Sequence, residues 1–150
     1  MDNAQLTPHI SQAEMGVLGC DVRLVANAQF LAEKILEPIR DHFEAPLRIH
    51  DGYRDPGHNS RVGGKPASFH LFDDGKAAAD FDIQGQGLHG VFDWVRLSSE
   101  LPFDKCILES NSEGIPACVH VQVDSLNPPR RQAFVGGTGA SQSYTQVTVS

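Results

Sequence analysis

The stretch that organises this chain is residues 68–83, which read SFHLFDDGKAAADFDI. It begins beside His70, passes through a loop around Gly75, and ends where apolar residues alternate with Asp80 and Asp82. Alternation with a period of two is typical of a strand whose two faces differ. Imidazole and carboxylate groups are ligands that suit Zn²⁺. The stretch therefore predicts a loop and a strand that present candidate zinc ligands.

A third candidate ligand lies far downstream, in residues 118–124. Every second residue of this predicted strand is valine and would form its core face, so His120 points to the opposite face. Two histidines and one carboxylate leave one tetrahedral position of zinc open, which is the pattern of a catalytic site. We therefore expect His70 and His120 to share a zinc ion with an aspartate. A period of two cannot choose between Asp80 and Asp82.

Hydrolysis at a zinc site also needs a base and a group that stabilises the developing oxyanion. Glu109 ends a strand predicted over residues 103–109, and a hairpin would pair this strand with the one that carries His120. Arg54 lies in a long loop rich in turn-forming residues. Glu109 is thus the candidate base and Arg54 the candidate oxyanion-stabilising residue. Cys118 is a poor candidate for a nucleophile. It lies two residues from His120 on the same strand face, which places the two side chains about 7 Å apart, too far for the histidine to activate the thiol directly.

The overall composition narrows the class of protein. The chain has 150 residues, 40% of them hydrophobic and 21% charged, as expected for one soluble globular domain with its own core. The net charge of −7 argues against nucleic acid or an anionic membrane as a partner. The three cysteines form no CxxC pair, which favours reduced thiols over a disulfide framework. The first residues show no signal-peptide pattern, and no apolar run is long enough to span a membrane.

Apolar residues spaced three and four apart predict helices over residues 26–43 and 87–100. Asn27 can cap the first of these, and Pro38 should kink it or divide it in two. The sequence Ser-Gln-Ala-Glu at residues 11–14 has capping-box spacing and predicts the start of a short helix. The chain therefore mixes helices with strands.

The character of the chain changes after residue 126. The run Pro128-Pro129-Arg130-Arg131 indicates a bend, and a glycine-rich and polar tail follows it. Alternating apolar residues near the end leave room for a late strand. We therefore expect one domain over residues 1–126 and an extension over residues 127–150, either an assembly arm or a late strand.

Seven short motifs occur in order along the chain: Gly52-Tyr53-Arg54, His58-Asn59, Val62-Gly63-Gly64, Ser68-x-His70, Gly75-x-Ala77, Ala79-Asp80-Phe81 and Val119-His120-Val121. Together they resemble the M15 family of zinc D-Ala-D-Ala carboxypeptidases and phage endolysins. Further upstream, Leu6-Thr7, Glu14-Met15 and Leu36-Glu37-Pro38-Ile39-Arg40 are similar to short members often encoded by phages and prophages. The resemblance covers about residues 6–124.

The resemblance implies an α+β fold of the hedgehog/DD-peptidase type, with a central antiparallel sheet and helices packed on one side. It also implies a single Zn²⁺ held by His70, Asp80 and His120. The implied reaction is hydrolysis of a peptide bond in the stem peptide of peptidoglycan, in a carboxypeptidase or endopeptidase manner.

The resemblance further implies roles around the metal. Arg54 and Ser68 match residues that contact substrate or stabilise the oxyanion. Glu109 matches a glutamate near the end of the penultimate strand in the short members. An endolysin-type enzyme of a phage would act from the host cytoplasm at lysis or travel with the virion, with neither nucleic acid nor membrane as its partner.

Two departures from the family pattern leave an alternative open. The family spacing SxHxxGxAxD is longer here, through Asp73-Asp74 and the three alanines before Asp80. Many members also carry a glutamate three residues before the last histidine, where this chain has Ala117. Either Glu109 serves as the base, or the protein is a non-catalytic virion or structural protein that keeps the M15 fold. In that case the tail would contact virion partners.

Overall fold

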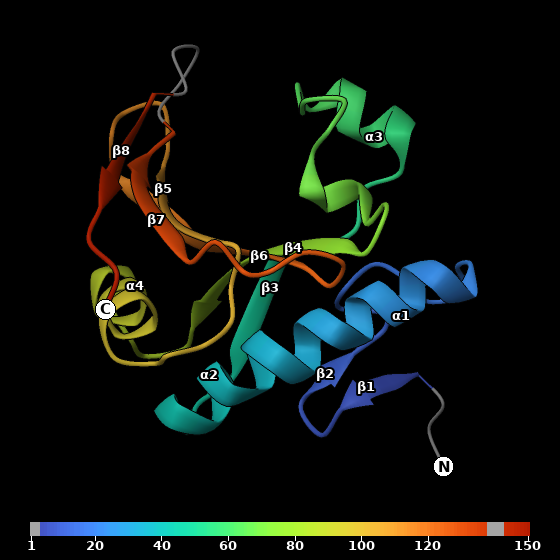
Figure 1. The fold of residues 1–150 in the computed structure, drawn as a ribbon, viewed down its shortest axis with the longest axis horizontal. Helices are drawn as coiled ribbons and strands as arrows, with labels where there is room; N and C mark the ends of the chain where they lie inside the picture. The colour runs from blue at the N-terminus through green and yellow to red at the C-terminus, as the bar shows by residue number, and fades with distance from the viewer. Residues whose placement is uncertain (1–3, 138–142) are drawn as a thin grey trace.

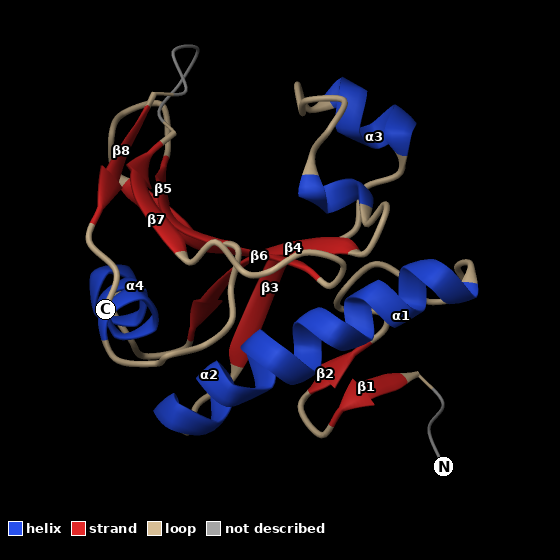
Figure 2. Cartoon of the chain, in the orientation of Figure 1, coloured by secondary structure: helices blue, strands red, loops and turns tan. Residues whose placement is uncertain are grey.

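A computed structural model describes residues 4–137 and 143–150, which fold around a six-stranded sheet (Figures 1 and 2). The strands lie in the order β3-β4-β6-β5-β7-β8. Their bounds are Leu47–Asp51 for β3, Lys76–Ile83 for β4, Lys105–Ser110 for β5, Pro116–Asp124 for β6, Gln132–Gly136 for β7 and Tyr144–Val147 for β8. Neighbouring strands pair antiparallel, except that β5 and β7 run parallel. The expected α+β fold with a central, mainly antiparallel sheet is confirmed.

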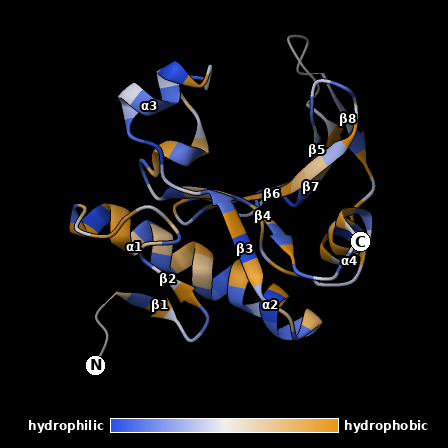
Figure 3. Cartoon of the chain, turned by 180° about the vertical axis from the view of Figure 1, so that it is seen from behind, coloured by the Kyte–Doolittle hydropathy of each residue, from blue (hydrophilic) through white to orange (hydrophobic). Residues whose placement is uncertain are grey.

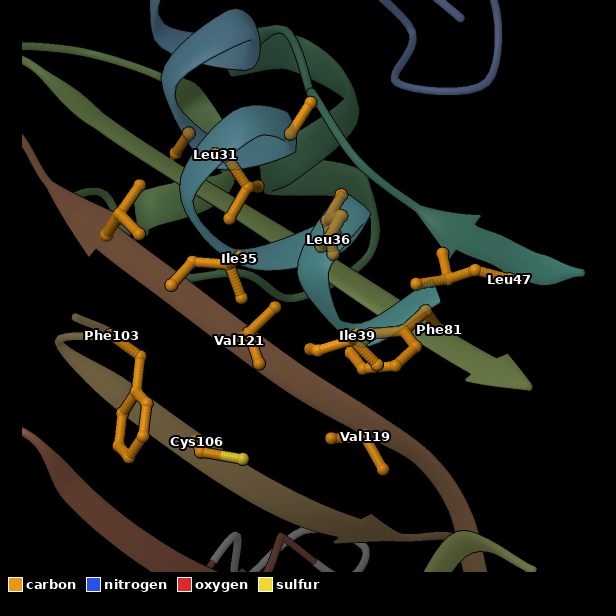
Figure 4. Close-up of a cluster of buried hydrophobic side chains, with 14 of the residues drawn as sticks. Leu31, Ile35, Leu36, Ile39, Leu47, Phe81, Phe103, Cys106, Val119 and Val121 are labelled. Atoms are coloured by element: carbon orange, nitrogen blue, oxygen red, sulfur yellow. The ribbon is translucent and has the colours of Figure 1, made fainter. Parts of the chain in front are cut away.

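One face of this sheet forms the core. The long helical segment over residues 22–43 and the helix α4 (Leu88–Leu97) both pack against this face and form one buried cluster with the sheet. In Figure 4, Leu31, Ile35 and Ile39 point toward the valines of β6. Hydrophobic and hydrophilic residues interleave along β3 and α1 (Val22–Leu31) in Figure 3, as expected for elements with one buried face. The strand residues that face the helices are Ala77, Ala79, Phe81, Cys106, Leu108, Val119, Val121 and Val123.

The helix predicted over residues 26–43 is longer and is interrupted. It consists of α1 (Val22–Leu31), a π-helical turn (Ala32–Leu36) and α2 (Glu37–Phe43). Pro38 lies in the first turn of α2 and has no N–H group to donate to a carbonyl of the preceding turn. The wider π turn lies directly before α2. The expected division at the proline therefore takes the form of a π turn between two helices.

Asn27 does not cap this helix, contrary to the sequence expectation. Asp21 is the cap, and its side chain accepts a hydrogen bond of 2.8 Å from the backbone N–H of Arg23. Asn27 lies inside α1 and donates instead to the carbonyl of Phe72 at 2.8 Å. Four more residues before position 26 thus belong to the helix, because Asp21 accepts from a free backbone N–H at the point where the chain enters it.

The N-terminal part forms a small hairpin, β1 (Gln5–Thr7) with β2 (Ile10–Ser11), followed by a turn. The capping-box bonds are present: Ser11 N–H donates to Glu14 at 2.9 Å, and Glu14 N–H donates to Ser11 at 3.1 Å. The helix expected there does not form. Gly16 has a φ of +78°, so the segment ends before a helix could propagate.

The remaining helices are short and lie in the loop between β3 and β4. They are α3 (Pro56–Arg61) and the 3₁₀ turn η2 (Phe69–Leu71). Together with their linkers they form a lobe that stands apart from the core helices (Figure 1). None of the helices among the described residues has the length and apolar character needed to cross a membrane.

The residues after 126 continue the main sheet within the described part of the chain. After β6 the chain crosses to the far side of β5, where β7 pairs in parallel with it and β8 pairs with β7. Residues 138–142 of this segment, and residues 1–3, lie outside the described residues. Whether residues 127–150 form a separate unit from residues 1–126 stays a prediction.

Candidate metal centre and its cleft

His70 is held by two contacts that leave one ring nitrogen available. It lies in η2, whose first turn is capped by Ser68: the side-chain oxygen accepts from the His70 backbone N–H at 3.2 Å. The ring Nδ1 lies 2.7 Å from the carbonyl oxygen of Gly52, which can only accept, so Nδ1 carries the proton and donates it. Nε2 is therefore unprotonated in the neutral ring and free to coordinate a metal.

Asp80 and His120 meet because β4 and β6 pair antiparallel. The two residues are direct partners in the register, and Oδ1 of Asp80 lies 2.9 Å from Nδ1 of His120. The same Oδ1 lies 3.6 Å from Nε2 of His70. The two imidazole rings have centroids 5.3 Å apart. The structure thus brings His70, Asp80 and His120 together from a loop and two neighbouring strands.

The three side chains fit a zinc ion by chemistry and by distance. Their ligand atoms all lie within 4.8 Å of one another. Ligands of a tetrahedral Zn²⁺, at about 2.0–2.2 Å from the ion, lie ~3.3 Å from one another. The distances of 2.9 and 3.6 Å from Asp80 to the two histidines bracket that value. The set of two imidazoles and one carboxylate is that of a catalytic zinc with an open fourth position.

Asp82, the other aspartate of β4, is engaged away from this group. Its carboxylate accepts from Arg48 at 2.7 and 3.1 Å and lies 3.0 Å from Nε2 of His50. Both partners are on β3, whereas the carboxylate of Asp80 contacts His120 on β6. Of the two aspartates that the sequence left open, Asp80 is therefore the one that lies beside the histidines, and its role as a metal ligand stays a prediction.

The electrostatics at this point favour a positive charge between the three residues. Burial disfavours the ionised form of Asp80, but the hydrogen bond from His120 and the charges of His120 and His70 outweigh burial and hold the pKa of Asp80 well below its usual range. Burial also opposes protonation of His120, yet the bond to Asp80 outweighs it and raises the pKa of His120. A cation is stabilised here, as a metal site requires.

Glu109 lies at the edge of the cluster on β5. Ile107 is the register partner of His120, so Glu109, two residues further, shares the face of β5 that carries the site. Its Oε1 is 3.9 Å from Nδ1 of His120. Burial raises the pKa of Glu109 above its ordinary value. A carboxylate with a raised pKa beside the metal ligands is suited to exchange protons.

Arg54 borders the same cleft, but its guanidinium is already bound. Nε and a terminal nitrogen each lie 2.6 Å from Oδ2 of Asp51, and the other terminal nitrogen donates to Asn59 at 3.2 Å. Ser68 likewise has a structural contact, the cap on His70. The substrate-contacting roles of Arg54 and Ser68 stay predictions.

A cleft of about 440 Å³ opens above the cluster. One wall is the lobe of α3 and its linkers, and the other is formed by β5, β7 and β8, which rise on the opposite side in Figure 1. Apart from Glu109, no local sequence pattern predicted the residues of this second wall. Lys105, Phe134 and Tyr144 line it, with Lys105 Nζ 5.3 Å from the centre of the Phe134 ring.

Within the part of the chain that the structure describes, we find no second hollow that holds a buried group of two histidines and a carboxylate. A hollow of about 550 Å³ near Tyr53 and Leu126 contains none of the three candidate ligands. The other possible ligand group among the described residues, His9, Glu37 and Asp41, lies at the surface, where His9 and Glu37 form an ion pair of 2.8 Å.

Comparison with known proteins identifies the family. A search of curated proteins found no match to this chain. The family model described as Peptidase M15 matches residues 4–111, which include Arg54, His70, Asp80 and Glu109. His120 lies beyond the matched residues and joins the cluster through β6. Since the match covers most of the chain and the mainly antiparallel sheet agrees with it, this chain belongs to the M15 family of peptidases.

Proposed function

We propose that this protein is a zinc-dependent peptidase that hydrolyses a peptide bond in the stem peptide of peptidoglycan. The observation that carries the proposal is the convergence of His70, Asp80 and His120 at the floor of an open cleft, with their ligand atoms within 4.8 Å of one another. M15 membership supports a metallopeptidase. The specific metal, the wall substrate and the choice between carboxypeptidase and endopeptidase action are the proposed part.

His70, Asp80 and His120 would hold the metal. When bound, Zn²⁺ supplies a Lewis acid that polarises the scissile carbonyl and lowers the pKa of water. Glu109 accepts a proton from the attacking water, whose oxygen forms the new bond to the carbonyl carbon. The same carboxyl group then gives the proton to the leaving nitrogen as the carbon–nitrogen bond breaks. Glu109 is suited to carry the proton between the two steps because burial raises the pKa of its carboxyl group above the ordinary value.

Arg54 is proposed to stabilise the negative charge on the carbonyl oxygen. It lines the cleft and its side chain is 16% exposed, so a bound peptide can reach it. The hydrogen bonds to Asp51 and Asn59 would hold the guanidinium in a fixed orientation, and a preorganised cation stabilises a transition state without reorganising. Ser68 would contact the substrate at the same wall.

The walls of the cleft fit an extended peptide. The cleft is open to solvent, and ammonium groups and aromatic rings are among the groups that line it. Lys65 and Lys105 offer positive charge to the carboxylates that peptidoglycan stem peptides carry. Phe134 and Tyr144 offer apolar surface to the peptide.

The alternative function is a non-catalytic virion or structural protein that keeps the M15 fold. The observation that favours it is Ala117, which occupies the position three before His120 where many M15 members carry the catalytic glutamate. Under this alternative the C-terminal residues would contact virion partners. Origin in a phage or prophage, with action at host lysis or from the virion, remains part of the proposal.

Metal analysis combined with a wall-digestion assay tests the proposal. The purified chain should contain zinc and release stem-peptide fragments from peptidoglycan. His120→Ala should abolish both zinc binding and release, whereas Glu109→Gln should abolish release and leave zinc in place. Asp82→Asn is the matched control, because Asp82 lies on the same strand but contacts β3. Bound zinc without any release by the wild type would favour the structural alternative.

A further inference from the structure

A buried chain of hydrogen bonds leads away from the metal centre to the C-terminal part of the molecule. Nε2 of His120 lies 2.8 Å from Oε1 of Gln122, and Nε2 of Gln122 donates to Asp104 at 2.8 Å. Arg130 then contacts the same carboxylate through two nitrogens, at 2.6 and 2.7 Å. His120, Gln122 and Asp104 are 6%, 6% and 3% exposed. Buried polar groups of this kind need defined partners, so each bond in the chain constrains the next.

The direction of every bond follows from the carboxylate at its end. An ionised carboxylate only accepts, and the two bonds from Arg130 stabilise that form of Asp104. The amide nitrogen of Gln122 must therefore face Asp104, and its oxygen must face His120. Since an amide oxygen also only accepts, Nε2 of His120 carries a proton and donates it. Nδ1, which lies 2.9 Å from Asp80 and donates to it in the metal-free site, would be the coordinating atom once a metal replaces its proton.

We propose that Gln122 positions the His120 ring as a metal ligand, and that Asp104 and Arg130 fix the orientation of the Gln122 amide. This inference rests on the proposed function, since it takes His120 to hold a metal. An amide whose two ends could exchange would offer Nε2 of His120 an N–H group instead, and would favour the ring tautomer with the proton on the metal-binding nitrogen. The Asp104 carboxylate excludes that orientation.

Arg130 ties the metal centre to a part of the chain that the family match does not cover. It lies after residue 111, in the segment that leads from β6 to β7. The side chain of the neighbouring Arg131 makes no hydrogen bond with this network. It donates to the carbonyls of Leu101 and Ser150, and its guanidinium lies over the ring of Phe103. Two neighbouring arginines thus hold the same segment, and only Arg130 reaches the network of His120.

This pair of arginines provides a matched experiment on the full chain. The zinc dissociation constant is measured by competition with a chromophoric chelator for the wild type, Gln122→Met, Arg130→Gln and Arg131→Gln. Gln122→Met should weaken zinc binding about 10–100-fold, the usual effect of removing a hydrogen-bond partner from a ligating histidine. Arg130→Gln should weaken it in the same direction but less. Arg131→Gln should leave it unchanged, and circular dichroism checks that each variant is folded.

A second readout separates positioning of the ring from general loosening of the fold. In the zinc-loaded wild type and in Arg131→Gln, the Nε2–H proton of His120 should give a slowly exchanging NMR signal. In Gln122→Met it should exchange rapidly. Wild-type affinity and slow exchange in Gln122→Met would overturn the inference, and equal losses in the two arginine variants would overturn the role of Arg130. Failure of the wild type to bind zinc would instead refute the proposed function itself.

Discussion

The carbonyl oxygen of Gly52 lies 2.7 Å from Nδ1 of His70, and it is this bond that turns the other nitrogen of the ring toward Asp80. Gly52 has no room for a side chain. A Cβ atom there would lie 2.6 Å from the carbonyl oxygen of Met15 and 3.1 Å from its Cα. The glycine of the Gly52-Tyr53-Arg54 motif is therefore needed to bring its own carbonyl close to the histidine.

Replacing Gly52 should consequently damage the metal centre. Gly52→Ala must displace the backbone that carries the carbonyl, and we expect it to weaken zinc binding by about tenfold or more. The measurement is a chelator competition, with thermal denaturation to follow stability. Gly90→Ala is the control: Gly90 lies in α4 with no atom near its Cβ position, so alanine should stabilise the protein by about 0.5–1 kcal/mol and leave zinc affinity unchanged.

Glu109→Gln should lower the hydrolytic activity and raise the stability of the folded protein. Loss of the proton-transferring group should lower kcat by about 10²–10⁴-fold. Because burial raises the pKa of Glu109 in the folded state, the folded protein binds this proton more tightly than the unfolded chain. The contribution of Glu109 to stability is thus full below the ordinary glutamate pKa and is lost as the pH rises through the raised value.

The metal-free Glu109→Gln variant should therefore be more stable than the wild type at neutral pH, on the order of 1 kcal/mol. The difference should vanish in acid. Thermal denaturation of both proteins across pH 4–8 measures it, with Glu113→Gln in the exposed hairpin loop as the control. A wild type that remains the more stable protein at neutral pH would show that Glu109 is not destabilised by its surroundings.

Cys118 should take no part in the chemistry. Burial raises the pKa of its thiol, and the nearby carboxylates of Asp80 and Glu109 add to this, so little thiolate forms at neutral pH. Cys118→Ser should keep full hydrolytic activity, and iodoacetamide should modify Cys118 slowly, as mass spectrometry of the labelled protein can show. Rapid labelling together with a loss of activity in Cys118→Ser would point to a thiol mechanism instead.

Tyr144 should contribute to substrate binding rather than to catalysis. It lines the cleft from β8 and is 41% exposed. Tyr144→Ala should raise KM by about 2–12-fold, corresponding to an aromatic contact of about 0.5–1.5 kcal/mol, and leave kcat and zinc content unchanged. Ile115→Ala, an exposed apolar residue of the β5–β6 hairpin loop, is the control. An effect on kcat alone would contradict this assignment.

Much of the fold could be predicted because local patterns and packing agree. The valines of β6 alternate with polar residues, and the structure buries them against the helices. The first helix could be recognised from its apolar stripe, but its start could not, since the helix capped by Asp21 begins at Val22, four residues before the predicted start. The parallel pairing of β5 with β7 depends on contacts between distant segments, which no local pattern encodes.

The residues of the candidate metal centre could be predicted less completely, for a similar reason. Asp80 and Asp82 share one strand face, so only the neighbours of β4 distinguish them. Gln122 lies two residues after His120 on β6, so the alternation of the strand predicts that both side chains lie on the same face. Asp104 and Arg130 precede their strands and show no periodicity, so only the folded chain reveals that they meet.

The parallel strand β7 also has a consequence for the solubility of shortened chains. It covers the backbone of β5 along the whole register from Lys105 to Glu109. A fragment that stops at residue 126 would leave the N–H and C=O groups on that side of β5 open, and such an edge is a template for another chain. We expect the fragment to self-associate and scatter light at concentrations where the full chain stays monodisperse.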